Sequence, residues 1–117
     1  MSITNVFASV AVKDITVSSA WYAALFSHPG TMTTRELAEW AFPQGGGLQV
    51  YRGPERAGNG SFTVSVTDIK AVIKNLSAIG IEANLLPSTN YAKTVMIKDP
   101  DGNSIAFAEK VGTAVAG

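Results

Sequence analysis

The sequence predicts an α+β fold made of two related modules, each on a βαβββ plan. The first observation is a repeat, because residues 10–15 (VAVKDI) and 64–69 (VSVTDI) both read as an alternating strand that runs into an aspartate and then a helix. The second is a glycine-rich segment that lies midway along the chain. A repeat unit cannot bury its apolar face alone, so the two modules are expected to pack as one domain spanning residues 1–117.

The first module, residues 5–53, opens with an alternating strand at residues 6–12. Asp14 or Thr16 caps the next helix, because either side chain accepts hydrogen bonds from the free amides of a first turn. Apolar residues recur at helical spacing until residues 28–30 (HPG) end the helix. Three strands are expected at 31–35, 38–42 and 47–52, with a hairpin connection at 43–46.

The second module, residues 61–110, follows a linker at 54–60 and repeats the plan. After a strand at 61–66, Asp68 caps a helix whose apolar residues follow an i, i+3, i+4, i+7 stripe, and Gly80 ends it in a left-handed conformation. Strands are expected at 81–86, 93–98 and 104–109, with a tight turn at 99–103 (DPDGN). The tail, residues 111–117, carries no pattern and is expected to fray.

Composition restricts the partners. Nine Lys and Arg balance nine Asp and Glu without a basic cluster, so neither nucleic acid nor an anionic membrane is expected. The chain has no cysteine for disulfides, thiolate chemistry or metal ligation. It shows neither the order of a signal peptide nor an apolar run as long as a membrane span. These features predict a soluble cytoplasmic protein.

Strand alternation predicts a core face, and a second face for a ligand. Leu48 and Val50 belong to the core. Trp40 and Phe42 share one strand face, and their register with Val95 and Ile97 places that face on the core side. In the first helix, Trp21 falls on the core stripe and Tyr22 on its margin, with its hydroxyl in water. The second face mixes small residues with aromatics, which suits a ligand surface. Its candidate ligand-binding residues are Phe7, Ser9, Glu39, Gln49, Tyr51, Ser61, Met96 and Ala106.

Phe7 and Tyr51 are the most suggestive pair on this face. A planar ligand stacks on such rings, and Arg35, Glu39 or Gln49 would hold its polar groups. The alternative is that Phe7 only fills space.

Three local patterns fit structural roles better than functional ones. Residues 99–103 lack calcium-loop spacing, because Lys110 stands at the twelfth position, so a turn is expected. Residues 45–47 (GGG) lead into a strand, so no helix N-terminus is present to bind phosphate. His28, the only histidine, lies beyond the first helix and away from the candidate face, which favours a surface role.

Residues 19–26 (SAWYAALF), the repeat and the closing residues 99–105 (DPDGNSI) together resemble the vicinal oxygen chelate superfamily. This group includes glyoxalase I, the bleomycin resistance proteins and the extradiol dioxygenases. The resemblance covers residues 6–109. It implies paired βαβββ modules whose mixed sheets curl around a shared cavity, usually in a homodimer. Whether the modules pair within one chain or swap between two stays open.

The resemblance also implies four metal-ligand positions, at Phe7, Gln49, Ser61 and Ala106. A divalent site of this kind needs imidazole and carboxylate donors, whereas Phe7 and Ala106 have no donor atom and Ser61 is a poor one. Only Gln49 can coordinate. The prediction is therefore a member near the bleomycin resistance branch that binds a planar or amphipathic small molecule, with no metal, cofactor or catalytic residue.

Two alternatives stay open. One is a metal-dependent lyase, isomerase or dioxygenase of the glyoxalase type. The other is a structural or interaction module whose cavity is filled.

Overall fold

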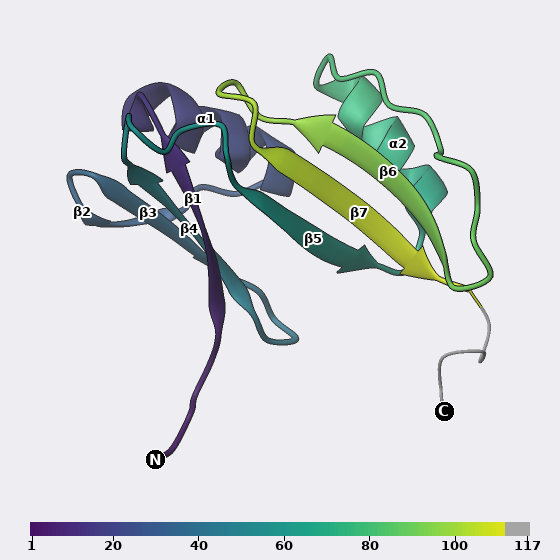
Figure 1. Ribbon diagram of the computed structural model, residues 1–117, viewed down its shortest axis with the longest axis horizontal. Helices are drawn as coiled ribbons and strands as arrows, with labels where there is room; N and C mark the ends of the chain where they lie inside the picture. The colour runs from purple at the N-terminus through teal and green to yellow at the C-terminus, as the bar shows by residue number, and fades with distance from the viewer. Residues whose placement is uncertain (112–117) are drawn as a thin grey trace. The chain divides into compact units, whose positions relative to one another are not determined.

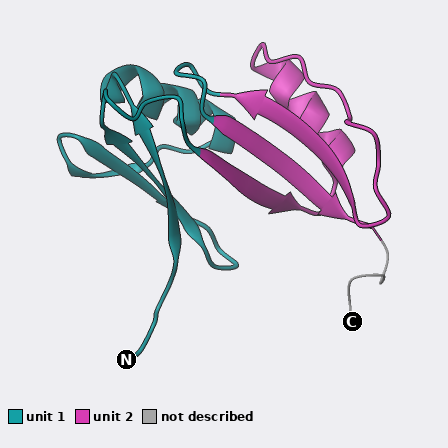
Figure 2. Cartoon of the chain, viewed as in Figure 1, with its two compact units in different colours: residues 1–60, 99–103 teal, residues 61–98, 104–117 magenta. Residues whose placement is uncertain are grey.

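The chain forms two compact units, each with one sheet and one helix. The computed structural model describes residues 1–111, so residues 112–117 of the predicted tail lie outside the described part. Unit 1 comprises residues 1–60 and 99–103, and unit 2 comprises residues 61–98 and 104–117 (Figure 2). Within residues 1–111, neither helix is long and apolar enough to cross a membrane.

Unit 1 has a four-stranded sheet covered by one helix (Figure 1). Its strand order is β1-β4-β3-β2, with β1 parallel to β4 and the other pairs antiparallel. Asp14, rather than Thr16, caps the helix, because its carboxylate accepts hydrogen bonds from the amides of Thr16 and Val17. Ser27, with φ of 63°, ends it in the left-handed region. The elements are β1 (Phe7–Val12), α1 (Ile15–Phe26), β2 (Thr31–Thr34), β3 (Leu37–Ala41) and β4 (Gly47–Arg52).

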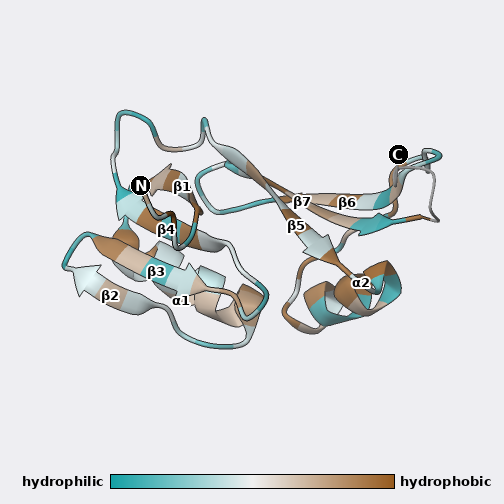
Figure 3. Cartoon of the chain, turned by 90° about the horizontal axis from the view of Figure 1, so that it is seen from below, coloured by the Kyte–Doolittle hydropathy of each residue, from teal (hydrophilic) through white to brown (hydrophobic). Residues whose placement is uncertain are grey.

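The face of this sheet next to α1 is the core of unit 1. The Trp40 ring lies 6.0 Å from the Tyr22 ring and 5.7 Å from the Phe26 ring, and Phe26 also contacts Phe42 at 5.2 Å between centroids. In Figure 3, α1 is coloured white to brown along its length, because it carries no charged side chain. The predicted core face is therefore confirmed. Its strand residues that are at most 1% exposed are Val10, Val12, Ala38, Trp40, Leu48 and Val50.

The prediction for the two neighbouring aromatic residues of α1 was wrong. Tyr22 is completely buried, while Trp21 is partly exposed and meets the Tyr22 ring edge-on at 4.9 Å. Tyr22 can be buried because its hydroxyl has a buried acceptor, the carboxylate of Asp99, at 2.8 Å. Helical spacing alone does not reveal an acceptor that lies 77 residues further along the chain.

The Asp99 carboxylate is 5% exposed and accepts four hydrogen bonds within unit 1. Its Oδ1 accepts from the amides of Asp101 and Asn103, both at 2.9 Å. Its Oδ2 accepts from the Tyr22 hydroxyl and from Asn103 Nδ2, both at 2.8 Å. A buried charge is tolerated when donors surround it in this way.

Asn103, which has no exposed surface, extends this network to β1. Its Nδ2 donates to the Ala11 carbonyl at 2.9 Å, and its Oδ1 accepts from the Gly60 amide at 2.8 Å. The Val12 carbonyl accepts from Gly53 on the β4 side, so the Ala11 carbonyl points to the free edge of β1. Asn103 therefore satisfies a backbone group that the sheet leaves unpaired.

The predicted turn at 99–103 is confirmed. The Asp99 amide donates to the Asn103 carbonyl and the Gly102 amide to the Asp99 carbonyl, each at 3.0 Å. Gly102 has φ of 98°, a conformation that favours glycine.

Unit 2 has a three-stranded sheet in the order β5-β7-β6, with β5 parallel to β7 and β6 antiparallel to it. The Asp68 carboxylate caps its helix, as predicted, and Glu109 Oε1 accepts from the Ile69 amide at 2.8 Å. Gly80, with φ of 84°, follows the helix in the left-handed conformation predicted for it. The elements are β5 (Ser61–Val66), α2 (Ile69–Ala78), β6 (Ala92–Lys98) and β7 (Ser104–Lys110).

The strand predicted at residues 81–86 is not formed. Only Leu85 forms an isolated bridge, to Val95, and the Leu86 amide donates to the Thr94 carbonyl. Pro87 follows at once and has no amide to continue a ladder, which limits the pairing to this point. The α+β class holds, and unit 2 has one strand fewer than the βαβββ plan.

Asp99→Asn is expected to lower the free energy of unfolding by about 3 kcal/mol, because an amide nitrogen would face at least one of the converging donors. Asp101→Asn is the matched control. Asp101 Oδ2 accepts one long bond, from the Lys13 amide at 3.3 Å, and asparagine keeps an acceptor there. Its cost should stay below about 1 kcal/mol in urea denaturation. Equal losses for the two variants would show that the Asp99 network adds no special stability.

Tyr22→Phe should make stability less sensitive to alkaline pH. Burial, the hydrogen bond to Asp99 and the charges of Asp99 and Asp101 all raise the pKa of the Tyr22 phenol. Tyrosine in the unfolded chain ionises near pH 10, so the contribution of Tyr22 is complete below about pH 10 and declines above it by about 1.4 kcal/mol per pH unit.

At neutral pH the Tyr22→Phe variant should be less stable by about 2 kcal/mol, because Asp99 loses a charge-assisted hydrogen bond. The difference in unfolding free energy between wild type and variant should shrink as the pH rises beyond about 10. A difference that stays constant across this range would contradict the role given to the hydroxyl.

Candidate ligand-binding face

The candidate site lies on the face of the unit 1 sheet that points away from α1, which we call the distal face. Side chains alternate along a strand, so the residues between the buried core positions project to this side. Three cross-strand pairs of β1 and β4 lie here in succession, and β3 adds Leu37, Glu39 and Ala41 beside them. The β1–β4 pairs are Phe7 with Gly47, Ser9 with Gln49 and Ala11 with Tyr51.

Each aromatic residue of the distal face stands opposite a small residue. A Cβ added at Gly47 would lie 2.3 Å from Phe7 Cε2, so the Phe7 ring rests on the backbone of β4. A Cβ added at Gly53 would lie 2.9 Å from Tyr51 Cε2 and 3.4 Å from the Ala11 Cβ, so the Tyr51 ring reaches over Gly53 beside Ala11. Both rings are partly exposed. The small residues let both rings lie close to the sheet.

A chain of hydrogen bonds connects the polar residues between the two rings. Ser9 Oγ donates to Gln49 Oε1 at 3.2 Å, and Gln49 Nε2 donates to Glu39 Oε2 at 3.0 Å. Glu39 and Gln49 are directly opposed in the β3–β4 ladder, so this chain runs across three neighbouring strands. Each aromatic residue is two positions from the Ser9–Gln49 pair, about 7 Å along the strand.

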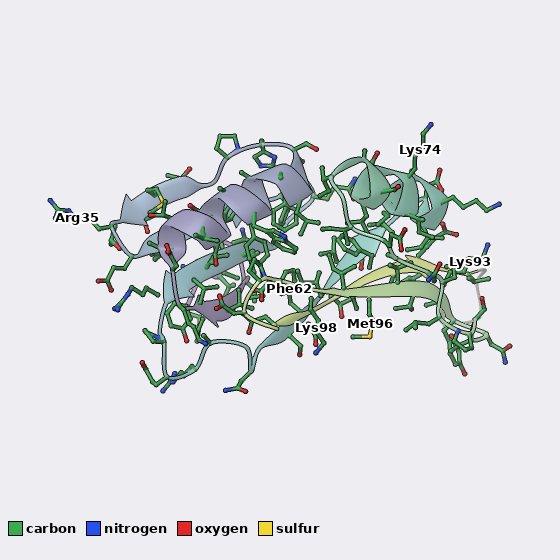
Figure 4. All side chains as sticks on the ribbon, turned by 90° about the horizontal axis from the view of Figure 1, so that it is seen from above. Arg35, Phe62, Lys74, Lys93, Met96 and Lys98 are labelled. Carbon is green, nitrogen blue, oxygen red and sulfur yellow. The ribbon has the colours of Figure 1, made fainter. Side chains whose placement is uncertain are left out.

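Two other residues of the first module, Arg35 and His28, lie in unit 1 but outside the strands that form the distal face. Arg35 lies between β2 and β3 and its side chain projects outward from the tip of the hairpin (Figure 4). His28 is exposed, and its Nδ1 lies 3.0 Å from the Phe26 carbonyl, consistent with the predicted surface role.

The candidates from the second module lie in unit 2. Met96 and Ala106 are directly opposed in the β6–β7 ladder, and Ser61 pairs with Ser104 at the start of β5. Met96 is 49% exposed and its side chain projects away from α2 (Figure 4). These three residues lie on the side of the unit 2 sheet that points away from α2. The first-module candidates of the distal face likewise lie on the side of the unit 1 sheet that points away from α1.

The side chains at the metal-ligand positions implied by the family resemblance do not suit a divalent metal. Phe7 and Ala106 offer no donor, and Ser61 offers only a neutral hydroxyl. The Gln49 oxygen already accepts from Ser9, and the Gln49 nitrogen donates to Glu39. Within residues 1–111, no group of three or more His, Cys, Asp or Glu side chains is placed to hold a metal ion.

Two features of the site were missed at the level of sequence. One is the hydrogen-bond chain through Ser9, Gln49 and Glu39, which depends on strand register. The other is the placement of Phe7 opposite Gly47 and of Tyr51 opposite Ala11. The register between β1 and β4 would have revealed both features, but these strands are separated by about 40 residues, and alternation within one strand does not fix it.

Comparison with known proteins identifies relatives by structure. No protein-family model matches the sequence, and a search of curated proteins also finds no match. Among solved structures, TnmS3, an antibiotic binding protein from Streptomyces sp. CB03234, is 20% identical, with 95% of this chain and 99% of that chain covered and a TM-score of 0.80. Lactoylglutathione lyase from Agrobacterium tumefaciens is 16% identical, with 92% and 94% covered and a TM-score of 0.75. These two likenesses show the fold alone.

A third structure carries more weight. The glyoxalase / bleomycin resistance protein from Catenulispora Acidiphila DSM 44928 is 36% identical to this chain, with a TM-score of 0.81. The match covers 90% of this chain and 96% of that chain. Sequence identity at this level, over nearly the whole of both chains, shows membership of the same family and not only a shared fold. The chain therefore belongs to the glyoxalase / bleomycin resistance protein family, within the vicinal oxygen chelate superfamily.

Proposed function

We propose that this protein binds a planar or amphipathic small molecule on the distal face of unit 1, without a metal. One observation carries the proposal: two aromatic side chains flank a hydrogen-bonded polar pair on a single sheet face. The rings give stacking surface and the polar groups give orientation, which is the usual division of labour in small-molecule sites.

The packing of the rings supports this function. Phe7 uses one side of its ring to cover Gly47, and the ring is only partly buried. Tyr51 is likewise partly buried over Gly53. A planar ligand would stack on the uncovered sides, with Ser9, Gln49 and Glu39 meeting its polar groups. Ser61, Met96 and Ala106 lie on the sheet of unit 2 and stay predicted ligand contacts of that unit alone.

The relatives support the same class of function. A solved structure of the same fold is named as an antibiotic binding protein, and the 36% identical relative bears the name glyoxalase / bleomycin resistance protein. The lactoylglutathione lyase of the same fold represents the enzymatic alternative. That alternative is weaker for this chain, because two of the four implied metal-ligand positions carry no donor atom.

The homodimer and the cytoplasmic location stay predictions. Light scattering of the purified protein would test the first, since a homodimer has twice the 12.2 kDa mass of the chain.

Phe7→Ala and Tyr51→Ala are each expected to weaken binding of a planar probe about tenfold, because each removes one stacking surface. Anthracene derivatives are suitable probes, since their fluorescence reports binding directly. Tyr91→Ala is the matched control: Tyr91 is 57% exposed and lies in unit 2, outside the proposed face. The control should bind within about twofold of wild type.

The outcome also separates binding from a purely structural role. If Phe7 only covers Gly47, then Phe7→Ala will lower the melting temperature and leave affinity unchanged, and the proposed face is wrong. The titration repeated with a chelator tests the metal-free part of the proposal. Binding that disappears with chelator and returns with nickel, zinc or manganese would instead support the enzyme of the glyoxalase type.

A further inference from the structure

The hydrogen-bond chain on the distal face has a fixed direction. A carboxylate can only accept, so Gln49 must present its Nε2 to Glu39. Its Oε1 then faces Ser9, and the single hydroxyl hydrogen of Ser9 is used to donate to it. The donors therefore run from Ser9 through Gln49 to Glu39, and no reversed arrangement satisfies the Glu39 carboxylate.

This direction leaves mainly acceptors for a ligand. Glu39 Oε1 has no hydrogen-bond partner among residues 1–111, and its Oε2 accepts only from Gln49. Ser9 Oγ keeps its lone pairs after donating its hydrogen. Among the side chains of Ser9, Gln49 and Glu39, the second Nε2 hydrogen of Gln49 is the only donor that is left to bind a ligand. The polar strip therefore offers acceptor atoms and one negative charge.

Glu39 also lacks a cationic partner. In the described part of the chain, no Lys or Arg side chain forms a hydrogen bond or ion pair with it. The residue is only partly exposed, since it lies within β3 between Gln49 on β4 and Thr31 on β2. A partly buried carboxylate gains more from a cation than an exposed one does, because water screens the attraction less.

The aromatic rings favour the same kind of ligand. The faces of Phe and Tyr rings attract cations within about 6 Å, and they repel anions for the same electrostatic reason. Phe7 and Tyr51 each lie about 7 Å along the strand from the Ser9–Gln49 pair, on either side of it. A ligand stacked on either ring can thus place a substituent at Glu39.

We infer that the distal face selects planar ligands that carry a protonated nitrogen, with Glu39 as the residue that binds the cation. This inference rests on the proposed function and adds the charge class of its ligand. The cationic nitrogen donates to Glu39 Oε1 while the aromatic part of the ligand stacks on Phe7 or Tyr51. Gln49 Nε2 donates to Glu39 Oε2 and so holds the Glu39 carboxylate in place. Ser9 donates to Gln49 Oε1 and so fixes the orientation of the Gln49 amide.

Two anthracene probes that differ only in charge test this inference. The cation is aminomethyl-anthracene and the anion is anthracene carboxylate, each titrated by fluorescence at neutral pH. Wild-type protein should bind the cation at least about tenfold more tightly than the anion, because a charge-assisted hydrogen bond is gained in one case and like charges meet in the other. Glu39→Gln should remove most of this preference, because it lowers the affinity for the cationic probe about tenfold.

Glu55→Gln is the matched control. Glu55 is exposed in the segment that follows β4, so its substitution removes the same charge without touching the distal face. It should change the affinity for either probe by less than about twofold. If Glu55→Gln lowers the affinity for the cationic probe as much as Glu39→Gln does, the effect comes from net charge and the inference is overturned.

The remaining outcomes separate this inference from the proposed function. If no anthracene probe binds, both are overturned. If binding depends on Phe7 and Tyr51 but Glu39→Gln keeps the preference for the cation, the inference falls and the proposed function stands. Unchanged melting temperatures for the two glutamine variants would exclude misfolding as the cause of any loss.

Discussion

The buried carboxylate of Asp99 is the constraint on which the rest of unit 1 depends. Its four donors come from α1 and from its own turn, and Asn103 extends the network to the free edge of β1 and to Gly60. A charge at this depth is stable only while each donor stays in position. The network thus fixes the end of β1, and with it the Ala11 position opposite Tyr51 on the distal face.

The division of the unit 1 sheet into two faces then determines what each face can do. One face is filled by aliphatic side chains and by the aromatic cluster around Trp40. The other carries two aromatic rings laid over small residues, with a directed chain of hydrogen bonds between them. Such a face gives a ligand surface and orientation, whereas the side chains at the metal-ligand positions of the superfamily give almost no donors. The side-chain chemistry of this face supports the proposed binding, whereas the fold is shared by an antibiotic binding protein and a lactoylglutathione lyase and does not choose between them.

Features set by local spacing could be predicted from the sequence. The two aspartate caps, the Gly80 helix end and the turn at 99–103 each depend on residues near one another in the chain. Tyr22 was placed on the wrong side because its partner, Asp99, is distant in sequence. The prediction of a strand at 81–86 was wrong, because the alternation of apolar and polar residues does not show where pairing with a neighbouring strand ends. The hydrogen bonds at Gln49 likewise depend on a long-range register.

Backbone amide chemical shifts, followed by NMR during titration with a planar aromatic probe, would show directly where a ligand binds. The largest changes are expected on the distal face of unit 1, at Phe7, Ser9, Glu39, Gln49 and Tyr51. Amides of the exposed side of α1 should change little. Changes confined to α1 or to the segment between α2 and β6, with the distal face unaffected, would contradict the proposed site and place ligand binding elsewhere.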